Sequence, residues 1–322
     1  MIYLSDEHID RIGISWQDVI SVIGNAVDMV SRKDYRQPVK PYLRYRNMVN
    51  RIIAMPAFLG GEVNAAGIKW IASFPGNIQQ GLARAHAVTI LNEADTGIPF
   101  CIINTNKISA IRTAGVTGLI IKSFLESRSA LQAPLEIGIT GFGPIGRMHL
   151  DLLRQMWWDD IAKVRLFDIR PVDISGLPED VLEKVEIVHS WEDAYVPADI
   201  FITCTVSSAP YINLPPKKGS LQANVSLRDY QPQMRAYMDR IIVDDWEEIC
   251  REKTDIEVMH HENGLNPEDT FSFTTHALDE LFAGTGTDDV IMFNPMGMAV
   301  FDIATGWWYY REAEEKAIKV EL

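Results

Sequence analysis

Cysteine is scarce in this chain of 322 residues, which has only Cys101, Cys204 and Cys250 and no C-x-x-C pair. A small, odd number of cysteines excludes a disulfide-stapled domain and favours a reducing compartment. Long apolar runs are lacking as well, because the longest uncharged stretch, 200–216, is interrupted by prolines and is too short to cross a bilayer. The first residues include early acidic side chains and no apolar segment of the signal-peptide kind. We therefore expect a cytoplasmic protein.

Basic residues are few relative to acidic ones. Lys and Arg number 30 against 44 Asp and Glu, which gives a formal net charge of −14. A surface this acidic repels phosphate backbones and anionic lipids, so we expect neither nucleic acid nor a membrane as partner. A small anionic substrate fits only where basic side chains gather locally. The 47% hydrophobic and 23% charged content is that of a globular protein, and the length corresponds to two domains of about 150 residues.

The N-terminal third has the pattern of an α+β domain. Apolar residues at helical spacing predict an amphipathic helix over 16–32. Ser109 is predicted to cap a second helix over 111–125. Alternating runs punctuated by Pro, Gly and Asn predict strands of a mostly antiparallel sheet at 51–55, 66–71, 86–92 and 99–104.

From residue 134 onward, short apolar strands alternate with helical segments. The predicted strands are 135–140, 163–167, 185–188, 200–204, 223–225, 241–243 and 290–293. This alternation predicts an α/β fold with a doubly wound parallel sheet. We place this domain at 113–292 and a second, α+β domain at 1–112, which a terminal helix within 293–322 joins.

A glycine turn follows the strand over 135–140 and opens a helix. Gly141, Gly143 and Gly146 fit G-x-G-x-x-G, and the strand–turn–helix context gives this pattern its weight. The first glycine permits a tight turn, the second lets the backbone approach a pyrophosphate, and the third lets the helix pack on the strand. Free N–H groups at the helix start favour anions. We therefore predict a Rossmann-type dinucleotide-binding domain, against the alternative of a glycine turn without a ligand.

Two further strand ends are predicted to contact the cofactor. Asp168 lies about 20 residues past Gly146, where such domains place the acid that binds the adenosine ribose. A carboxylate there repels a 2′-phosphate and favours NAD, although Arg170 is able to accept that phosphate, so NADP stays open. Thr205 and Ser207 follow the strand over 200–204, at the edge where doubly wound sheets bind ligands. The alternative for this pair is a hydroxyl-rich turn.

The chain resembles the ornithine cyclodeaminase/μ-crystallin superfamily over nearly its full length. The segments that carry the resemblance are Met55-Pro56, 67–70, 111–114, the glycine turn, 224–229 and 296–302. Segments 38–44, 51–56, 243–246 and 294–299 are most similar to the branch of dehydrogenases that act on N-(2-amino-2-carboxyethyl)-L-glutamate in siderophore biosynthesis. The resemblance implies a homodimer that pairs through the N-terminal sheet domain, and a Rossmann domain that binds NAD.

The resemblance also implies a reaction. A hydride leaves the glutamate Cα beside a secondary amine, water hydrolyses the imine, and the products are 2-oxoglutarate and L-2,3-diaminopropionate, a precursor of siderophores or peptide antibiotics. Binding three carboxylates requires fixed cations. By family position, Arg44, Lys69 and Arg112 hold the substrate α-carboxylate, with Arg46 as the alternative to Arg44. Arg84 is expected to be an additional carboxylate ligand.

Asp229 matches the family's catalytic aspartate. It follows the strand over 223–225, where a carboxylate could take a proton from the amine or activate the water, and Lys69 is the second residue assigned to catalysis. The cofactor-binding residues that the motif and the resemblance imply are Arg112, Thr113, Gly141, Gly143, Pro144, Ile145, Gly146, Asp168, Thr205, Ser207, Asn294, Met296 and Gly297. We expect no metal, since His260, His261 and His276 lack the H-E-x-x-H spacing.

Ile53 departs from the family pattern. Cyclodeaminases have a glutamate at this position, three residues before the proline of the Met-Pro pair, so its replacement argues against ornithine cyclisation. Alanine dehydrogenase and ketimine reductase activities stay open. A non-catalytic, crystallin-like nucleotide-binding protein is a further alternative, and the presence of Lys69 and Asp229 argues against it.

Overall fold

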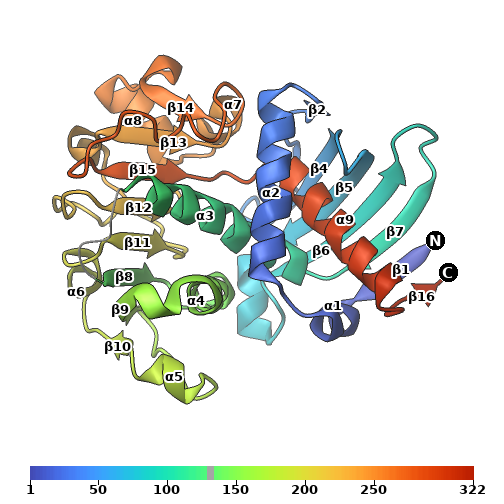
Figure 1. Cartoon of the computed structure of the whole chain (residues 1–322), viewed down its shortest axis with the longest axis horizontal. Coiled ribbons are helices and arrows are strands. Elements are labelled where there is room, and N and C mark those ends of the chain that lie inside the picture. The colour runs from blue at the N-terminus through green and yellow to red at the C-terminus, as the bar shows by residue number, and fades with distance from the viewer. Residues whose placement is uncertain (129–133) are drawn as a thin grey trace. The chain divides into compact units, whose positions relative to one another are not determined.

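The computed structural model describes residues 1–128 and 134–322, which form two compact units. Unit 1 comprises 1–116 and 297–322, and unit 2 comprises 117–296 (Figure 1). The domain boundaries expected from the sequence, after residues 112 and 292, each lie four residues before the boundaries between the units, after residues 116 and 296. Helix α3 (Lys107–Ser127) contains the first junction, so its N-terminal half belongs to unit 1 and its C-terminal half to unit 2.

Unit 1 is built on an eight-stranded sheet in the order β16-β1-β7-β6-β5-β4-β2, with β3 also paired to β4. Its strands are β1 (Ile2–Ser5), β2 (Tyr35–Arg36), β3 (Tyr42–Leu43), β4 (Arg51–Leu59), β5 (Ala65–Ser73), β6 (Ala85–Glu93), β7 (Pro99–Asn104) and β16 (Val320–Glu321). The strands β4 to β7 are antiparallel to one another, as predicted. β1 pairs in parallel with β7, and it has no counterpart in the sequence prediction.

One face of this sheet is covered by helices. α2 (Trp16–Ser31) packs on α9 (Ala299–Glu315), α9 crosses β4, β5 and β6, and α1 (Asp6–Ile12) lies beside α9 (Figure 1). Gly67 allows this close approach, because a Cβ there would lie 2.9 Å from the Ile303 Cδ1 of α9. Trp308 and Tyr309 are buried on α9, as core-filling aromatics.

The opposite face of the sheet keeps apolar side chains partly exposed. Two rows of them cross the central strands: Pro56, Ile68, Ile90 and Ile102, and then Ala54, Trp70 and Val88. Side chains alternate between the faces of a strand, so Lys69 is buried on the α9 face while its neighbour Trp70 is 44% exposed on the other. Contiguous apolar side chains that stay partly exposed are typical of an interaction surface.

Unit 2 has the doubly wound architecture that the sequence predicts. Eight parallel strands lie in the order β10-β9-β8-β11-β12-β15-β13-β14 (Figure 1). They are β8 (Leu135–Thr140), β9 (Ile161–Phe167), β10 (Val185–Ile187), β11 (Ile200–Thr203), β12 (Leu221–Asn224), β13 (Arg240–Val243), β14 (Thr270–Ser272) and β15 (Ile291–Asn294). The helices are α4 (Pro144–Trp157), α5 (Glu179–Leu182), α6 (Trp191–Tyr195), α7 (Trp246–Ile249) and α8 (Asp255–Asn263). The strand order reverses between β8 and β11, and ligands of such sheets bind beyond the carboxyl ends of the strands at that point.

The predicted cap of α3 is wrong. The helix begins at Lys107, so Ser109 lies inside its first turn. Thr105 provides the local bond instead, because its Oγ1 accepts a hydrogen bond from the backbone N–H of Lys107 at 2.9 Å. By length and composition, α3 is the helix among the described residues that could cross a membrane, and 72% of its apolar window is buried, as in a core helix.

Candidate active site

Three elements of unit 1 bring two cations onto one buried carboxylate. Lys69 of β5 places its Nζ 2.9 Å from Oδ1 and 2.8 Å from Oδ2 of Asp302, which lies on α9. Arg112 of α3 donates from Nε to the same Oδ1 at 3.0 Å. Lys69 is 1% exposed, Arg112 8% and Asp302 0%. The structure therefore brings together Lys69 and Arg112, which the sequence assigned to one substrate group, and adds an acid that the sequence left without a role.

Lys40 and Gly297 complete this cationic cluster. The buried Lys40 donates from Nζ to the backbone oxygen of Gly297 at 2.9 Å. Gly297 has φ +89°, and a Cβ there would lie 2.6 Å from Nη1 of Arg112. A side chain at this position would therefore both strain the backbone and displace the guanidinium. Sequence reasoning missed Lys40 and Asp302, although both lie in segments that carry the family resemblance.

Two buried cations share one carboxylate in this cluster. Burial lowers the pKa of Lys69 to about 7, because Asp302 only partly offsets it while Arg112 and Lys40 lower it further. Burial acts to raise the pKa of Asp302, but the charges of Arg112 and Lys69 overcome that effect and lower it. Lys69 and Arg112 thus share a single buried carboxylate, and Lys40 lies close enough to lower the pKa of Lys69. A second anion bound here would stabilise the charged form of Lys69.

The other predicted substrate residues lie elsewhere in unit 1. Arg44 places its guanidinium over the ring of Tyr42, 4.9 Å from the centroid, and Arg51 approaches the same ring at 5.3 Å. Arg46 is exposed, with φ +54°. Arg84 is partly buried immediately before β6. Arg44 therefore stacks on an aromatic ring, whereas Lys69 and Arg112 share a carboxylate.

The glycine turn of unit 2 leaves room for a ligand at one position. A Cβ on Gly141 would lie 2.5 Å from the carbonyl carbon of Cys204, and one on Gly146 would lie 2.2 Å from the oxygen of Gly141. A Cβ on Gly143 would meet nothing within 4 Å. Gly143 is also the residue before the first turn of α4, where Pro144 and Ile145 begin the helix. Two glycines are thus required by packing, and the third borders open space at a helix N-terminus, which fits an anionic group.

Asp168 is held beside this turn. One carboxylate oxygen accepts a hydrogen bond from the backbone N–H of Phe142 at 2.9 Å, and the other accepts from the N–H of Arg170 at 2.9 Å. The Arg170 side chain lies 3.6 Å from the same carboxylate. These residues, with Arg147 and 171–173, line a pocket of about 220 Å³. Asp168, which favours NAD, and Arg170, which could accept the 2′-phosphate of NADP, thus line the same pocket.

Asp229 is fully buried in a shell of hydroxyl groups. The Thr205 hydroxyl donates to both of its oxygens, at 2.6 and 2.8 Å, the Ser226 hydroxyl donates at 2.6 Å, and the Tyr211 hydroxyl donates at 3.3 Å. Burial raises the pKa of Asp229, and these hydroxyls and Arg228 oppose the rise. An aspartate that is buried yet solvated by hydroxyls is suited to proton transfer.

Sequence reasoning identified Asp229 but not its partners. Ser226 lies in the segment 224–229 that carries the resemblance, and Tyr211 has no sequence signal at all. The hydroxyl of Thr205, a predicted cofactor contact, is bound to Asp229. The hydroxyl of Ser207, the other predicted contact, donates to the backbone oxygen of Ala209 at 2.6 Å.

The strand ends next to Asp229 form a second polar network. Asn224, at the end of β12, donates from Nδ2 to Oδ1 of Asn294 at 2.8 Å and to Oδ2 of Asp255 at 2.9 Å. Asn294 ends the neighbouring strand β15, and Met296 packs against the apolar core of unit 2. Thr113, also predicted near the cofactor, lies on α3, and its hydroxyl donates to the backbone oxygen of Ser109 at 2.7 Å.

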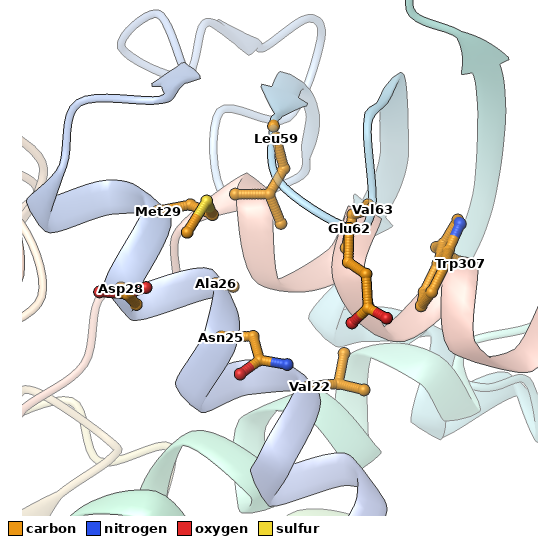
Figure 2. A pocket seen from close by; sticks show the side chains of 10 residues that line it. Val22, Asn25, Ala26, Asp28, Met29, Leu59, Glu62, Val63 and Trp307 are labelled. Carbon is orange, nitrogen blue, oxygen red and sulfur yellow. The ribbon is translucent and has the colours of Figure 1, made fainter.

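A separate pocket of about 240 Å³ lies in unit 1 between α2 and the β4–β5 turn. Figure 2 shows the Glu62 carboxylate between Asn25 and Trp307. Asp28, at the rim, is paired with Arg32 at 2.9 Å. The pocket lacks the residues singled out from the sequence. Within 1–128 and 134–322, no group of three His, Cys, Asp or Glu side chains is arranged to hold a metal.

Comparison with known proteins identifies the family. The profile of the ornithine cyclodeaminase/mu-crystallin family matches residues 10–215. The chain belongs to this family. N-((2S)-2-amino-2-carboxyethyl)-L-glutamate dehydrogenase of Staphylococcus aureus is 30% identical to it, over 100% of this chain and 98% of that protein.

Solved structures share the fold of this family member. Thermococcus litoralis Δ¹-pyrroline-2-carboxylate reductase, solved with NADH and L-proline, has a TM-score of 0.86 at 22% identity, with 100% of both chains covered. An archaeal alanine dehydrogenase dimer with bound NAD has a TM-score of 0.81 at 23% identity, covering 100% of this chain and 99% of that one. The Rossmann-type fold expected from the sequence is therefore confirmed.

Proposed function

We propose that this protein is an NAD-dependent dehydrogenase that oxidises the C–N bond of N-(2-amino-2-carboxyethyl)-L-glutamate. The substrate, NAD⁺ and water would give 2-oxoglutarate, L-2,3-diaminopropionate, NADH and a proton. The substrate class comes from the relative that is 30% identical over the full length. The observation that carries the proposal is the buried pair of Lys69 and Arg112, two cations that share the single carboxylate of Asp302 and so favour a further anion.

The cationic cluster is the proposed anchor for the substrate α-carboxylate. Lys69 and Arg112 donate charge-assisted hydrogen bonds, which are stronger than neutral ones and fix orientation. Asp302 holds both donors in place before the ligand arrives. A bound carboxylate would also raise the pKa of Lys69 from about 7 towards its ordinary value, so binding near neutral pH would take up a proton. Arg44 is the proposed third ligand of the α-carboxylate, and Arg84 the proposed ligand of an additional carboxylate.

The residues of unit 2 fit a dinucleotide. Gly143 borders open space at the start of α4, where the free N–H groups would bind the pyrophosphate, and Asp168 would bind the adenosine ribose. The remaining proposed contacts are Arg112, Thr113, Pro144, Ile145, Thr205, Ser207, Asn294, Met296 and Gly297. Bound NAD⁺ supplies the hydride acceptor of the reaction.

Asp229 is the proposed proton-transfer group. The amine nitrogen must be unprotonated when the Cα–H bond breaks, because its lone pair forms the C=N bond as the hydride leaves. Water then adds to that carbon, the C–N bond breaks, and a proton goes to the departing amine. A carboxylate whose pKa is raised by burial is suited to accept and return these protons. Its hydroxyl partners hold it in one orientation between the two steps.

We further propose that the protein is a cytoplasmic homodimer. The partly exposed apolar rows on the open face of the unit 1 sheet, with Trp70 at 44% exposure, are the surface proposed for pairing. Burying such a face would remove its apolar area from water. Sedimentation analysis of the wild type and of Trp70→Glu tests this: we expect a dimer and a monomer, and a monomeric wild type would contradict the proposal.

Substrate choice is tested directly by kinetics. The purified protein is incubated with NAD⁺ and, in turn, the glutamate adduct, alanine, ornithine and glutamate, while NADH absorbance is followed and the products are identified by mass spectrometry. We expect turnover of the adduct with release of 2-oxoglutarate. A higher kcat/KM for alanine, or reduction of a cyclic imine with NADH in preference, would assign the protein to another activity of its family.

A further inference from the structure

Asp229 lies on a loop whose backbone is held in an unfavourable conformation. Between the end of β12 and Asp229, Leu227 has φ +65°, in the left-handed region. A leucine in this region is strained, because its Cβ lies too close to the backbone carbonyl. The Leu227 side chain is 5% exposed and packs in the core of unit 2. This loop keeps its shape only because other contacts hold it on both sides.

Asp255 of α8 makes three of those contacts. The backbone N–H of Asp255 donates to the backbone oxygen of Leu227 at 2.8 Å. The Asp255 carboxylate accepts hydrogen bonds from the backbone N–H of Asp229 at 3.1 Å and from that of Tyr230 at 3.1 Å. Asp255 therefore binds the loop before and after the strained position. Asn224 adds a further bond, its Oδ1 accepting from the Leu227 N–H at 3.1 Å.

The side chain of Asp255 is buried and has several donors. It is 4% exposed, and its Oδ2 accepts from Asn224 Nδ2 as well as from the two loop amides. It lies at the first position of α8, where the helix N-terminus favours a negative charge. Burial raises the pKa of Asp255 to about 6, and the hydrogen bonds oppose that rise. The Asp255 carboxylate therefore directs its charge at backbone N–H groups of the loop that carries Asp229.

The same contacts extend to the neighbouring strand. Asn224 uses its Nδ2 for both Asp255 and Asn294, so a single amide connects the loop of Asp229 to the end of β15. Ser226, within the loop, donates to Asp229. A loop that moved would therefore disturb the carboxylate, one of its hydroxyl partners and the end of β15 together.

We propose that Asp255 is a positioning residue that fixes the Leu227 turn and thereby the location of the Asp229 carboxylate. The catalytic consequence rests on the proposed function, whereas the effect on the backbone does not. A misplacement of about 1 Å in a reacting group lowers rates by roughly a hundredfold. Because Asp255 touches neither the cationic cluster of unit 1 nor the hydroxyl groups of Asp229 in the described contacts, its loss acts on kcat rather than on the KM of the substrate.

The test compares Asp255→Asn and Asp255→Ala with a matched control, Asp245→Asn. Asparagine keeps an oxygen that accepts from the loop amides, whereas alanine does not. Asp245 is a partly buried aspartate that caps α7 in the same unit, where it accepts from Glu248 N at 3.2 Å, and asparagine caps helices equally well. Hydrogen exchange of the peptide spanning 225–231 is measured by mass spectrometry, together with kcat, KM and thermal stability. Asp229→Asn provides the reference for lost proton transfer.

We expect exchange of this peptide to accelerate in the order wild type, Asp255→Asn, Asp255→Ala. We expect kcat to fall by about 10-fold and about 100-fold in the two variants, with the substrate KM within about threefold of wild type. Asp245→Asn should match the wild type in the exchange of this peptide and in kcat. If Asp255→Ala does not fold, Asp255→Asn alone decides the outcome.

Unchanged exchange in the Asp255 variants would overturn the proposal. Faster exchange with unchanged kcat would also overturn it, because the loop would then be free to move without consequence for the reaction. Equal effects of asparagine and alanine would show that the charge acts, not the hydrogen bonds to the backbone, and would contradict the positioning role. Full activity of Asp229→Asn would instead contradict the proposed function, and the exchange result would stand independently.

Discussion

The replacement of Asp302 by asparagine removes the negative charge from the cationic cluster without changing the shape of the side chain. Lys69 and Arg112 lie 2.8–3.0 Å from this carboxylate, and all three groups are buried. Removing one partner of a buried ion pair typically costs about 3–5 kcal/mol, because the other charge is left buried. Lys69 has a pKa near 7 and sheds its proton readily, whereas arginine does not. We therefore expect the free energy of unfolding to fall by about 3 kcal/mol at neutral pH, at the lower end of that range.

We expect the stability lost in Asp302→Asn to increase as the pH falls. Without Asp302, the pKa of Lys69 falls below its wild-type value of about 7, since the carboxylate is the group that raises it. Below pH 7, Lys69 of the folded wild type becomes protonated, whereas Lys69 of the folded variant stays neutral. The unfolded chain is protonated in both proteins, so the variant continues to lose stability as the pH falls and the difference in free energy of unfolding grows. Equilibrium urea unfolding at neutral and mildly acidic pH measures it.

The matched control is Asp28→Asn, also in unit 1. Asp28 pairs with Arg32 on the surface of α2 at 2.9 Å, and the two side chains are 47% and 68% exposed. Exposed pairs contribute about 0–1 kcal/mol. If Asp302→Asn lost no more stability than this control, or if its loss did not grow towards acidic pH, Asp302 would not be the group that stabilises the two buried cations.

Three further outcomes follow from the same geometry. Asp229→Asn should bind NAD normally and lose about 10²- to 10⁴-fold in kcat, the typical contribution of a proton-transfer group; a kcat above about a third of wild type would move that role elsewhere. Asp168→Ala should raise the KM for NAD⁺ more than that for NADP⁺, because it removes the ribose ligand while leaving Arg170 in the pocket; a wild type that prefers NADP⁺ would contradict this assignment. Lys69→Met should flatten the pH dependence of stability between about pH 7 and pH 10. In this interval the unfolded chain binds a proton that folded Lys69, with its lowered pKa, does not, so wild-type stability rises with pH; an equally steep rise in the variant would contradict the pKa near 7.

The spacing of apolar residues along the sequence predicted the strands and helices well, because the burial of one face of each element imposes that spacing. The apolar alternation at 51–55 and 86–92 identified β4 and β6, which have one face under α9 and the other open. The strand–turn–helix context of the glycines identified β8 and α4. Short strands such as β2 and β3 escaped prediction, since two residues are too few to show a period. Ser109 was assigned as a cap by residue type alone, but Thr105 occupies the place from which a side chain reaches the first N–H of α3.

The candidates for the site came either from a residue's own position in the sequence or from the family resemblance, which supplied Arg112 and Asp229. Lys69 stands out because it interrupts an apolar strand, and Asp168 because its distance from the glycine turn is fixed by the fold. Tyr211, Asp255 and Asp302 acquire their roles from tertiary contacts with residues 18 to 233 positions away. Local sequence does not encode such pairings, which become visible only when strand order and helix packing bring the side chains together.

The hydroxyl shell of Asp229 has a consequence for how its proton is accommodated. Thr205, Ser226 and Tyr211 all direct hydrogens at Oδ2 of the carboxylate, so a proton on that oxygen would meet them unless a neighbour turned away. Ser226 has such an alternative, because Thr203 Oγ1 lies 2.7 Å from its Oγ and either atom can donate. Rotation of one hydroxyl therefore lets the carboxylate change charge with every heavy atom in place. In the role proposed for Asp229, proton transfer would be coupled to a hydroxyl rotation, and a solvent deuterium isotope effect on kcat that Ser226→Ala alters would be its measurable signature.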